Sequence, residues 1–337
     1  MNEFIITGDT GSGSKEQYLV AKSMENLIQK RPHIKSIIIA GDNIYDYGVS
    51  SLNDPQFINK FHKPYQNISL PFYLCLGNHD YGKSGKNQQI QINYTYSNQN
   101  LNQKWNLPYQ WYIQSYSYCD FFFIDTNFEF SNIWNSSMIQ QQFNDISHLI
   151  QQSQKPWKIL CGHHTFRSVG GHGNASPQLE QFLQKLISSN NIDLYICGHD
   201  HCKSIIEIPI QNTNKIIPTL VIGTGGKKYN KDLFFPNNLK KDNSLLQFFS
   251  PHLGICHMKI NKHILQLSCY NEQLQNEYNY LLTKNYNKLY NNKLSMKSKF
   301  CKCKPTCKCK PKCKCSKKNN KSSRRRKYSR RRRNKSK

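Results

Sequence analysis

Five short clusters of Asp, Asn, His and Tyr residues are the parts of this chain that could do chemistry. In each, a glycine stands next to side chains that offer oxygen or nitrogen to metal ions. The clusters are Gly8-Asp9, Gly41-Asp42-Asn43-Ile44-Tyr45, Gly77-Asn78-His79-Asp80, Gly162-His163 and Gly198-His199-Asp200-His201. Oxygen and imidazole ligands suit zinc, iron or manganese. One Asp or His at such a place is usually a turn residue or a helix cap, but five clusters in one chain indicate a metal site.

Each cluster directly follows a short apolar run, which predicts a buried strand. The runs are residues 4–6, 37–40, 72–76, 157–161 and 194–197. In open α/β sheets, ligands bind beyond the carboxyl ends of the strands. The five clusters are therefore expected to meet at one edge of the fold.

Helices are predicted between these strands. Residues 14–30 show a helical apolar stripe, and Ser14 and Gln17 match a capping box. Further helices are predicted over residues 54–62, 138–152 and 176–189, whereas the polar residues 82–106 are expected to form a long surface excursion. A strand–helix–strand unit implies parallel strands under helical cover.

Strand-like runs without intervening helices follow His201, at residues 204–208, 217–222, 253–260 and 263–267. They are expected to extend an antiparallel sheet. Together, these elements predict an α/β (α+β-like) fold in which helices cover the outer faces of a β-sandwich. We expect this domain to span residues 1–270, followed by a late helix or linker at 271–300.

Residues 301–337 differ from the rest in composition. They contain six cysteines in Cys-Lys-Cys repeats and nineteen lysines and arginines without any acidic residue, so they supply +19 of the formal charge of +27. Such a segment is expected to be a disordered basic tail. Its arginines predict nucleic-acid binding or nuclear localisation. Its cysteines could bind soft metals or form interchain disulfides.

The sequence shows no secretory signal, since the first predicted strand begins almost at Met1. No apolar run approaches the roughly 20 residues of a membrane span. We therefore expect a soluble protein with no membrane partner, located in the cytoplasm, the nucleus or a virus particle. Reduced cysteines are expected in the first two compartments.

The five clusters resemble the pattern of calcineurin-like metallophosphoesterases, whose fold is a four-layer α/β/β/α sandwich. The form Gly-Asp-x-x-Tyr around Tyr45 is similar to that of purple acid phosphatases of the small, tartrate-resistant type. In that group a second histidine lies nine residues beyond the fourth-cluster histidine, as His172 does beyond His163. The resemblance covers roughly residues 1–270 and excludes the tail.

This resemblance implies two metal ions that share Asp42. A ferric ion would be bound by Asp9, Asp42, Tyr45 and His201, and an Fe²⁺, Zn²⁺ or Mn²⁺ ion by Asp42, Asn78, His163 and His199. The ions would lower the pKa of a bound water, and the resulting hydroxide would attack a phosphomonoester. His79 and His172 would contact the phosphate and protonate the leaving group. The substrate would be a phosphorylated small molecule or a phosphoprotein.

Other functions fit parts of the sequence. A phosphodiesterase or nucleotide hydrolase of the same fold would use similar clusters, although Tyr45 and the spacing to His172 favour a monoesterase. An inactive phosphatase-like body could serve as a nucleic-acid-binding protein through residues 301–337, although the complete ligand set favours an enzyme. Asp9-Thr10-Gly11 also matches the aspartic-protease signature, but Asp125-Thr126 lacks the glycine that a second copy needs.

Overall fold

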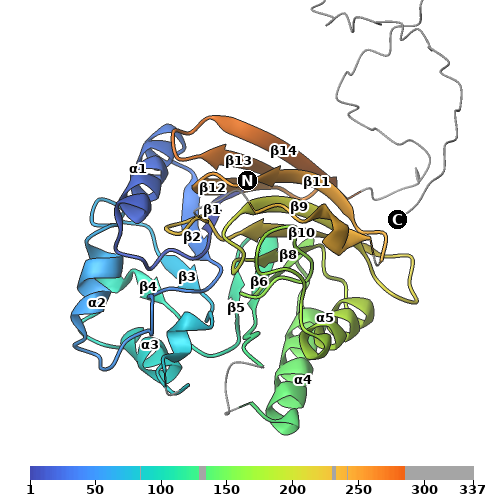
Figure 1. Cartoon of the computed structure of the whole chain (residues 1–337), viewed down its shortest axis with the longest axis horizontal. Coiled ribbons are helices and arrows are strands. Elements are labelled where there is room, and N and C mark those ends of the chain that lie inside the picture. The colour runs from blue at the N-terminus through green and yellow to red at the C-terminus, as the bar shows by residue number, and fades with distance from the viewer. Residues whose placement is uncertain (84, 129–133, 230–232, 241, 285–337) are drawn as a thin grey trace, which may run out of the picture. The chain divides into compact units, whose positions relative to one another are not determined.

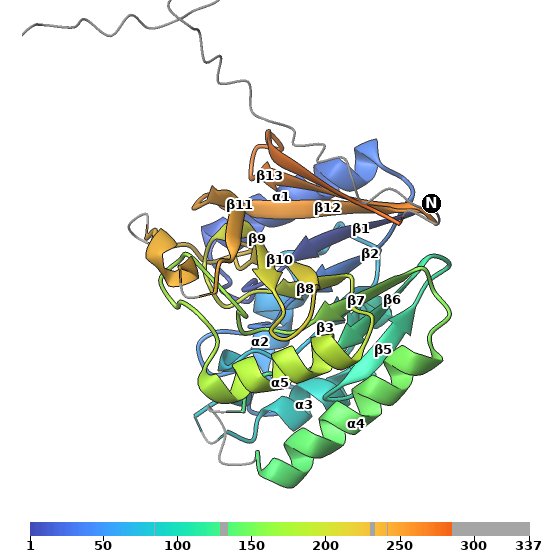
Figure 2. The same ribbon diagram turned by 90° about the vertical axis from the view of Figure 1, so that its right-hand side faces the viewer.

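The computed structural model describes residues 1–83, 85–128, 134–229, 233–240 and 242–284. These residues form two seven-stranded sheets with helices on the outer sides (Figure 1). Helices α1, α2 and α3 lie beside the first sheet, and α4 and α5 beside the second (Figure 2). The predicted α/β/β/α sandwich is therefore confirmed.

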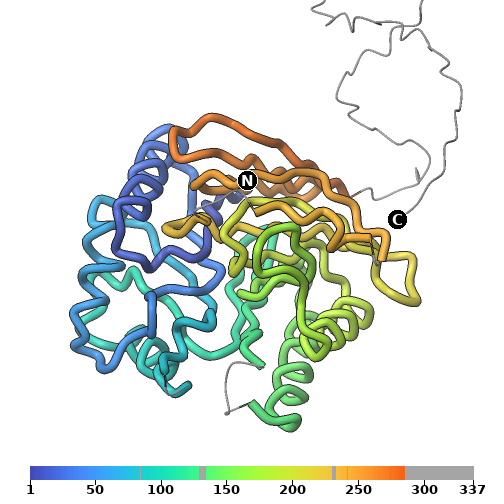
Figure 3. The backbone as a smooth tube through the Cα atoms, viewed as in Figure 1, coloured from blue at the N-terminus to red at the C-terminus, as the bar shows by residue number. Residues whose placement is uncertain are grey.

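The first sheet has the strand order β14-β13-β12-β1-β2-β3-β4. Its parallel half comprises β1 (Asn2–Thr7), β2 (Ile34–Ile39), β3 (Phe72–Leu74) and β4 (Trp105–Asn106). Its antiparallel half comprises β12 (Gly254–Ile260), β13 (Ile264–Asn271) and β14 (Asn276–Thr283). The two halves join where β1 pairs with β12, so the N-terminal strand lies beside one of the last strands (Figure 3).

The second sheet has the order β11-β9-β10-β8-β7-β6-β5. Its strands are β5 (Tyr112–Ser115), β6 (Cys119–Phe123), β7 (Trp157–Cys161), β8 (Leu194–Cys197), β9 (Lys203–Pro209), β10 (Ile216–Ile222) and β11 (Leu245–Ser250). Strands β6, β7, β8 and β10 run parallel to one another. The carboxyl ends of these strands consequently lie at a common edge of the sheet.

The helices follow the predicted pattern. They are α1 (Lys15–Lys30), α2 (Pro55–Phe57), α3 (Gln88–Tyr94), α4 (Ser136–Gln152) and α5 (Pro177–Ser189), and a π-helical turn (Ile58–His62) continues α2. The Ser176 side chain caps α5 by accepting from the Leu179 amide. At α1 the predicted capping box does not form, because Gln17 accepts from the Gly13 amide, one residue before Ser14, and Ser14 makes no cap bond.

Buried apolar side chains form two clusters. One fills the space between the two sheets, with Phe4, Ile38, Phe121 and Leu220, and continues over the first sheet to side chains of α1, α2 and α3. The other packs the outer face of the second sheet against α4 and α5. Burial of this much apolar surface is the main term that stabilises the sandwich.

Two predictions about the chain's organisation were wrong. Residues 276–283, expected in a late helix or linker, form the edge strand β14, because Tyr278, Tyr280 and Leu282 pack on the core at every second position. Residues 82–106 contain α3 rather than only a surface excursion, with Tyr94 stacked on Phe57. The tail at 301–337 and most of 271–300 lie outside the described residues.

Within the described residues, every helix is too short or too polar to span a membrane.

Candidate metal centre

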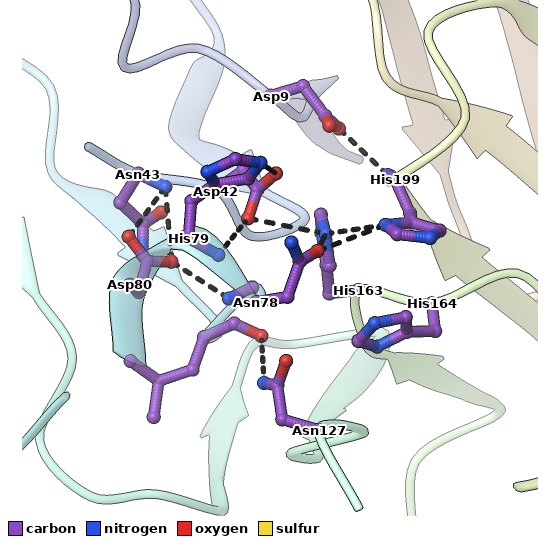
Figure 4. A network of polar contacts seen from close by, with 12 residues as sticks. Asp9, Asp42, Asn43, Asn78, His79, Asp80, Asn127, His163, His164 and His199 are labelled. Carbon is purple, nitrogen blue, oxygen red and sulfur yellow. Dashed lines mark hydrogen bonds and ion pairs between the residues drawn. The ribbon is translucent and has the colours of Figure 1, made fainter. Parts of the chain in front are cut away.

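The five clusters converge at the carboxyl ends of strands from both sheets (Figure 4). Asp9, Asp42 and Asn78 follow β1, β2 and β3 of the first sheet. His163 follows β7 of the second sheet, and the loop after β8 carries His199 and His201. Parallel strands within each sheet place these loops together, as the sequence predicted.

The side chains of Asp9, Tyr45 and His201 form one compact group. The Tyr45 hydroxyl donates to Oδ1 of Asp9 over 2.9 Å and lies 3.3 Å from Nε2 of His201. Nε2 of His201 lies 3.4 Å from the same Asp9 oxygen. Three donor atoms from three loops thus approach one another closely.

The side chains of Asn78, His163 and His199 form a second group of the same size. Oδ1 of Asn78 lies 3.1 Å from Nε2 of His163 and 3.1 Å from Nδ1 of His199. The two imidazole nitrogens are 3.3 Å apart.

Asp42 belongs to both groups. Its Oδ1 lies 3.3 Å from Nε2 of His163. Ligand atoms of Asp9, Asp42 and His163 all lie within 4.8 Å of one another. A carboxylate with two oxygens at this position is suited to span two ions.

The donor atoms fit metal ions. Bonds of about 2.0–2.2 Å from one ion to oxygen and imidazole ligands bring neighbouring ligand atoms to roughly 3 Å of each other, and both groups show such spacings. Nδ1 of His163 lies 2.8 Å from the Ala40 carbonyl, to which it can donate, so Nε2 is left to bind a metal. Burial, together with the charges of His164 and His163, lowers the pKa of His199 well below its usual value and keeps this ring in the neutral form that metals require.

The carboxylate and phenol of the first group have shifted pKa values. Burial opposes ionisation of Asp9, but hydrogen bonding to His201 and the charge of His163 hold its pKa below the usual value. Burial raises the pKa of Tyr45 well above its usual range, and the charges of Asp42 and Asp9 raise it further. Without a cation, Tyr45 is therefore a neutral hydrogen-bond donor.

The loops that carry the ligands are strained and tightly packed. Asp9, Asp42 and His199 have φ angles of 57°, 52° and 66°, in the left-handed region that non-glycine residues rarely adopt. A Cβ atom on Gly77 would lie 2.2 Å from Oδ1 of Asp42, and one on Gly198 would lie 2.4 Å from Oδ2 of Asp9. Each of these two glycines thus makes room for the side chain of another cluster.

The two predicted non-ligand histidines lie beside the groups. Nδ1 of His79 contacts the Asp46 carbonyl at 2.6 Å, and its Nε2 lies 3.9 Å from Oδ2 of Asp42. The His172 ring lies 4.4 Å from the His199 ring. Burial and the charge of His201 lower the pKa of His172, with Asp200 opposing them.

A cavity of about 220 Å³ opens beside His172. Thr126, His164, Thr165, His172, Asn174, Ala175, Ser176, Leu179 and His199 line it. His164, which directly follows His163 in the chain, lines this cavity and contacts the Thr126 hydroxyl through Nδ1. Burial, aided by the charge of His163, lowers the pKa of His164 well below its usual value.

Three further residues support the site: sequence analysis placed Asp80 and Asp200 in the clusters without giving them a role, and it missed Tyr229. Asp80 accepts hydrogen bonds from the amides of Gly77, Asn43 and Ile44, which ties the second and third clusters together. Burial and the charge of Asp42 raise the pKa of Asp80 to about 6.

The other two supporting residues, Asp200 and Tyr229, contact each other. Asp200 accepts from the Tyr229 hydroxyl, and the Tyr229 ring lies 5.2 Å from the ring of His201. A signal for Tyr229 existed, because the glycine-rich stretch starting at Gly223 also follows an apolar strand. No metal-type ligand stands directly after Gly223, so the sequence pattern does not mark this loop as part of the site.

Comparison with known protein sequences gives a consistent result. The sequence profile described as calcineurin-like phosphoesterase matches residues 3–203. Purple acid phosphatase 3 of Arabidopsis thaliana is 31% identical over 244 residues, which cover 67% of this chain and 63% of that protein, just under two thirds of its length. Purple acid phosphatase 17 of the same plant is 30% identical over 264 residues, covering 73% and 74%. Tartrate-resistant acid phosphatase type 5 of Homo sapiens is 25% identical over 223 residues, covering 59% and 66%.

Two solved structures share the fold. GAP50 of Plasmodium, described as the anchor in the inner membrane complex, superposes with a TM-score of 0.69 at 23% identity, covering 85% of this chain and 90% of that one. Purple acid phosphatase PPD1 from yellow lupin (Lupinus luteus) seeds superposes with a TM-score of 0.65 at 17% identity, covering 85% and 54%.

Proposed function

The chain belongs to the calcineurin-like phosphoesterase family, and we propose that it is a phosphomonoesterase with two metal ions, similar to the purple acid phosphatases. The observation that carries this proposal is the pair of donor groups that Asp42 joins. Asp9, Tyr45 and His201 form one group, and Asn78, His163 and His199 form the other. Two adjacent sets of ligands are what a binuclear hydrolase needs.

The chemistry of the donors suggests which ion each group would hold. Asp9, Asp42, Tyr45 and His201 would hold Fe³⁺, because a phenol with a strongly raised pKa needs a highly charged ion to ionise it. Asp42, Asn78, His163 and His199 would hold Fe²⁺, Zn²⁺ or Mn²⁺, which accept neutral imidazole and amide ligands. When bound, the two ions activate water and offset the charge of the phosphate group.

We infer that His79 would bind the substrate phosphate. Its Nδ1 can donate to the Asp46 carbonyl, so the ring orientation is fixed and Nε2 is directed toward the Asp42 side of the centre. A protonated Nε2 would donate to a phosphate oxygen.

We infer that His172 would protonate the leaving group. It lines the cavity of about 220 Å³ that also borders His199, and this cavity has room for a small leaving group. Burial lowers the pKa of His172, so its protonated form is a stronger acid than an ordinary imidazolium.

The test is hydrolysis of p-nitrophenyl phosphate and of bis(p-nitrophenyl) phosphate after the protein has been loaded with iron plus zinc or manganese. We expect the monoester to be the better substrate. Higher kcat/KM on the diester would indicate a phosphodiesterase. No turnover of either compound would favour a non-enzymatic role, such as the anchoring role described for GAP50, which shares this fold.

Residues 301–337 suggest a second function, because nineteen positive charges without an acidic residue attract phosphate backbones. We propose that this tail binds nucleic acid. Binding of the full chain to a DNA duplex should weaken steeply as salt rises. A chain that ends at residue 300 should bind far less, and equal binding by both would refute this function.

A further inference from the structure

We propose that Lys227 binds the phosphate group of the substrate from outside the metal centre and so selects for monoester dianions. This inference rests on the proposed phosphatase function and names a residue that sets its specificity. Lys227 belongs to the loop after β10, which none of the five sequence clusters includes.

The Lys227 ammonium stands over the ring of Tyr45, with Nζ 4.3 Å from the ring centroid. The same ring lies 4.4 Å from the ring of His79, and its hydroxyl contacts Asp9 and His201. Lys227 is therefore one aromatic ring away from both the ligand group and the histidine proposed to bind phosphate. The flexible stem of a lysine allows its ammonium to reach an anion bound there.

The backbone before Lys227 is fixed against the first ligand loop. The Gly225 amide donates to the Gly8 carbonyl over 2.9 Å. A Cβ atom on Gly225 would lie 2.5 Å from Oγ1 of Thr7, and one on Gly226 would lie 2.4 Å from the Thr10 carbonyl oxygen. These close approaches set the position of Lys227 relative to Asp9, so the charge is presented to the site by a rigid loop.

The existing partner of Lys227 holds it only weakly. Its ion pair is with Asp46, at 3.8 Å between Nζ and Oδ1, and the Asp46 side chain is 67% exposed. An exposed, loosely spaced pair of this kind contributes little energy. The Lys227 side chain is itself only 33% exposed, so its charge is less screened than that of a surface lysine. An incoming phosphate dianion can therefore compete for the ammonium.

The positive charge of Lys227, added to the charge of the metal ions, would distinguish monoesters from diesters. A monoester dianion carries one more negative charge than a diester, so it gains more from Lys227. Loss of one charge-assisted hydrogen bond, about 1.5–3 kcal/mol, corresponds to a weakening of binding by about ten- to a hundredfold.

The experiment measures inorganic phosphate binding by calorimetry and p-nitrophenyl phosphate kinetics on the metal-loaded full chain. Lys227→Met should weaken phosphate binding and raise KM by about tenfold. Its kcat should stay within about threefold, since the variant removes binding rather than chemistry. Lys227→Arg should restore most of the affinity. Asp46→Asn should tighten phosphate binding, because it frees the ammonium from its competing carboxylate.

Lys228→Met is the matched control, because this neighbouring lysine is exposed, whereas the Lys227 ammonium stands over the Tyr45 ring. The inference is overturned if Lys227→Met leaves phosphate affinity unchanged or if Lys228→Met weakens it equally. A wild-type protein without turnover would refute the proposed function, whereas the phosphate affinities of the variants would still decide the role of Lys227.

Discussion

The Tyr45 hydroxyl lies 2.9 Å from Oδ1 of Asp9, although the two residues are 36 positions apart in the chain. They belong to the loops after β2 and β1, which pair in parallel within the first sheet. Burial and the carboxylates of Asp42 and Asp9 keep the phenol neutral in the metal-free protein. A highly charged cation would replace the hydroxyl proton of Tyr45. The ionisation state of Tyr45 therefore tests the assignment of Fe³⁺ to this group.

Replacing Tyr45 with Phe should abolish the violet absorption band of aerobically purified, iron-loaded protein, because among the carboxylate, imidazole and phenol donors of this group only an ionised phenol gives intense visible charge transfer to Fe³⁺. Iron content and the visible spectrum should be measured on the same sample. Tyr65→Phe is a control, since Tyr65 is also fully buried but contacts Gln17 rather than the donor groups. A band that survives in Tyr45→Phe would contradict the assignment of iron to this group.

Replacing Asn78 with Ala should lower the occupancy of one metal ion while the other remains. Asn78 contacts His163 and His199 of the second group, so this group loses a donor while Asp9, Tyr45 and His201 keep theirs. We expect affinity for the divalent ion to fall by about 10–100-fold, measured as metal-to-protein ratio after dialysis.

Asn127→Ala serves as the control for this change. Asn127 is buried near the site but donates to Leu76 and Asp125. It should alter stability without altering metal stoichiometry. Equal loss of both ions from Asn78→Ala would mean that the two groups do not bind independently.

Replacing His172 with Asn should slow the hydrolysis of alkyl phosphates more than that of p-nitrophenyl phosphate. An alkoxide must be protonated as it leaves, whereas p-nitrophenolate leaves readily without a proton. Removal of a general acid typically costs about 10²–10⁴-fold on the demanding substrate. The kcat ratio for the two substrates is the measurement, and an unchanged ratio would exclude His172 as the proton donor.

The convergence of the clusters was predictable because it depends on local signals. An apolar run that ends in Gly and a polar residue marks a strand end, and parallel strands bring such ends together. Which side chains touch was not predictable. The contact of Asn78 with both His163 and His199 depends on how two separate sheets pack, and no local pattern records that.

Helix α3 and strand β14 were not predicted from the sequence, and each has a physical reason. Helix α3 is rich in Gln and Asn, which read as surface residues, yet Gln91 is buried and donates to Asp80 over 2.9 Å. Its polar side chains are satisfied inside the fold rather than by water. Strand β14 did carry a period-two signal at Tyr278, Tyr280 and Leu282, but the surrounding Asn- and Tyr-rich composition obscured it.

Replacing Gly198 with Ala should displace Asp9 and lower metal occupancy at the first group. The new Cβ would lie 2.4 Å from Oδ2 of Asp9 and 2.6 Å from the Ala40 carbonyl oxygen. Such overpacking costs about 1–3 kcal/mol of unfolding free energy, measurable by urea denaturation.

Gly173→Ala is the control for Gly198→Ala. It separates the displacement of Asp9 from the backbone strain of an alanine at a positive φ angle. Gly173 has a φ of +77°, so alanine there costs about 1–2 kcal/mol, but the nearest atom to the new Cβ is 3.8 Å away. The two variants should have similar stability and different iron contents. Normal iron content in Gly198→Ala would show that the loop can shift without loss of the site.

His62, far from the metal ligands in sequence, should make the stability of the protein depend on pH. Burial and the charge of Lys104 lower its pKa from 6.5 to about 4. The unfolded chain therefore binds more protons than the folded chain between these values. The contribution of neutral His62 to stability should be full above pH 6.5 and should fall as the pH is lowered toward 4.

Comparison of the metal-free wild type with His62→Gln by urea denaturation tests this expectation. Nε2 of His62 contacts the Tyr94 hydroxyl at 2.9 Å, and glutamine retains a polar group that does not titrate. The wild type should lose unfolding free energy more steeply than the variant between pH 6.5 and 4.5. Parallel pH profiles would show that His62 keeps the same pKa in the folded and unfolded states, since titratable groups common to both proteins cancel in the difference.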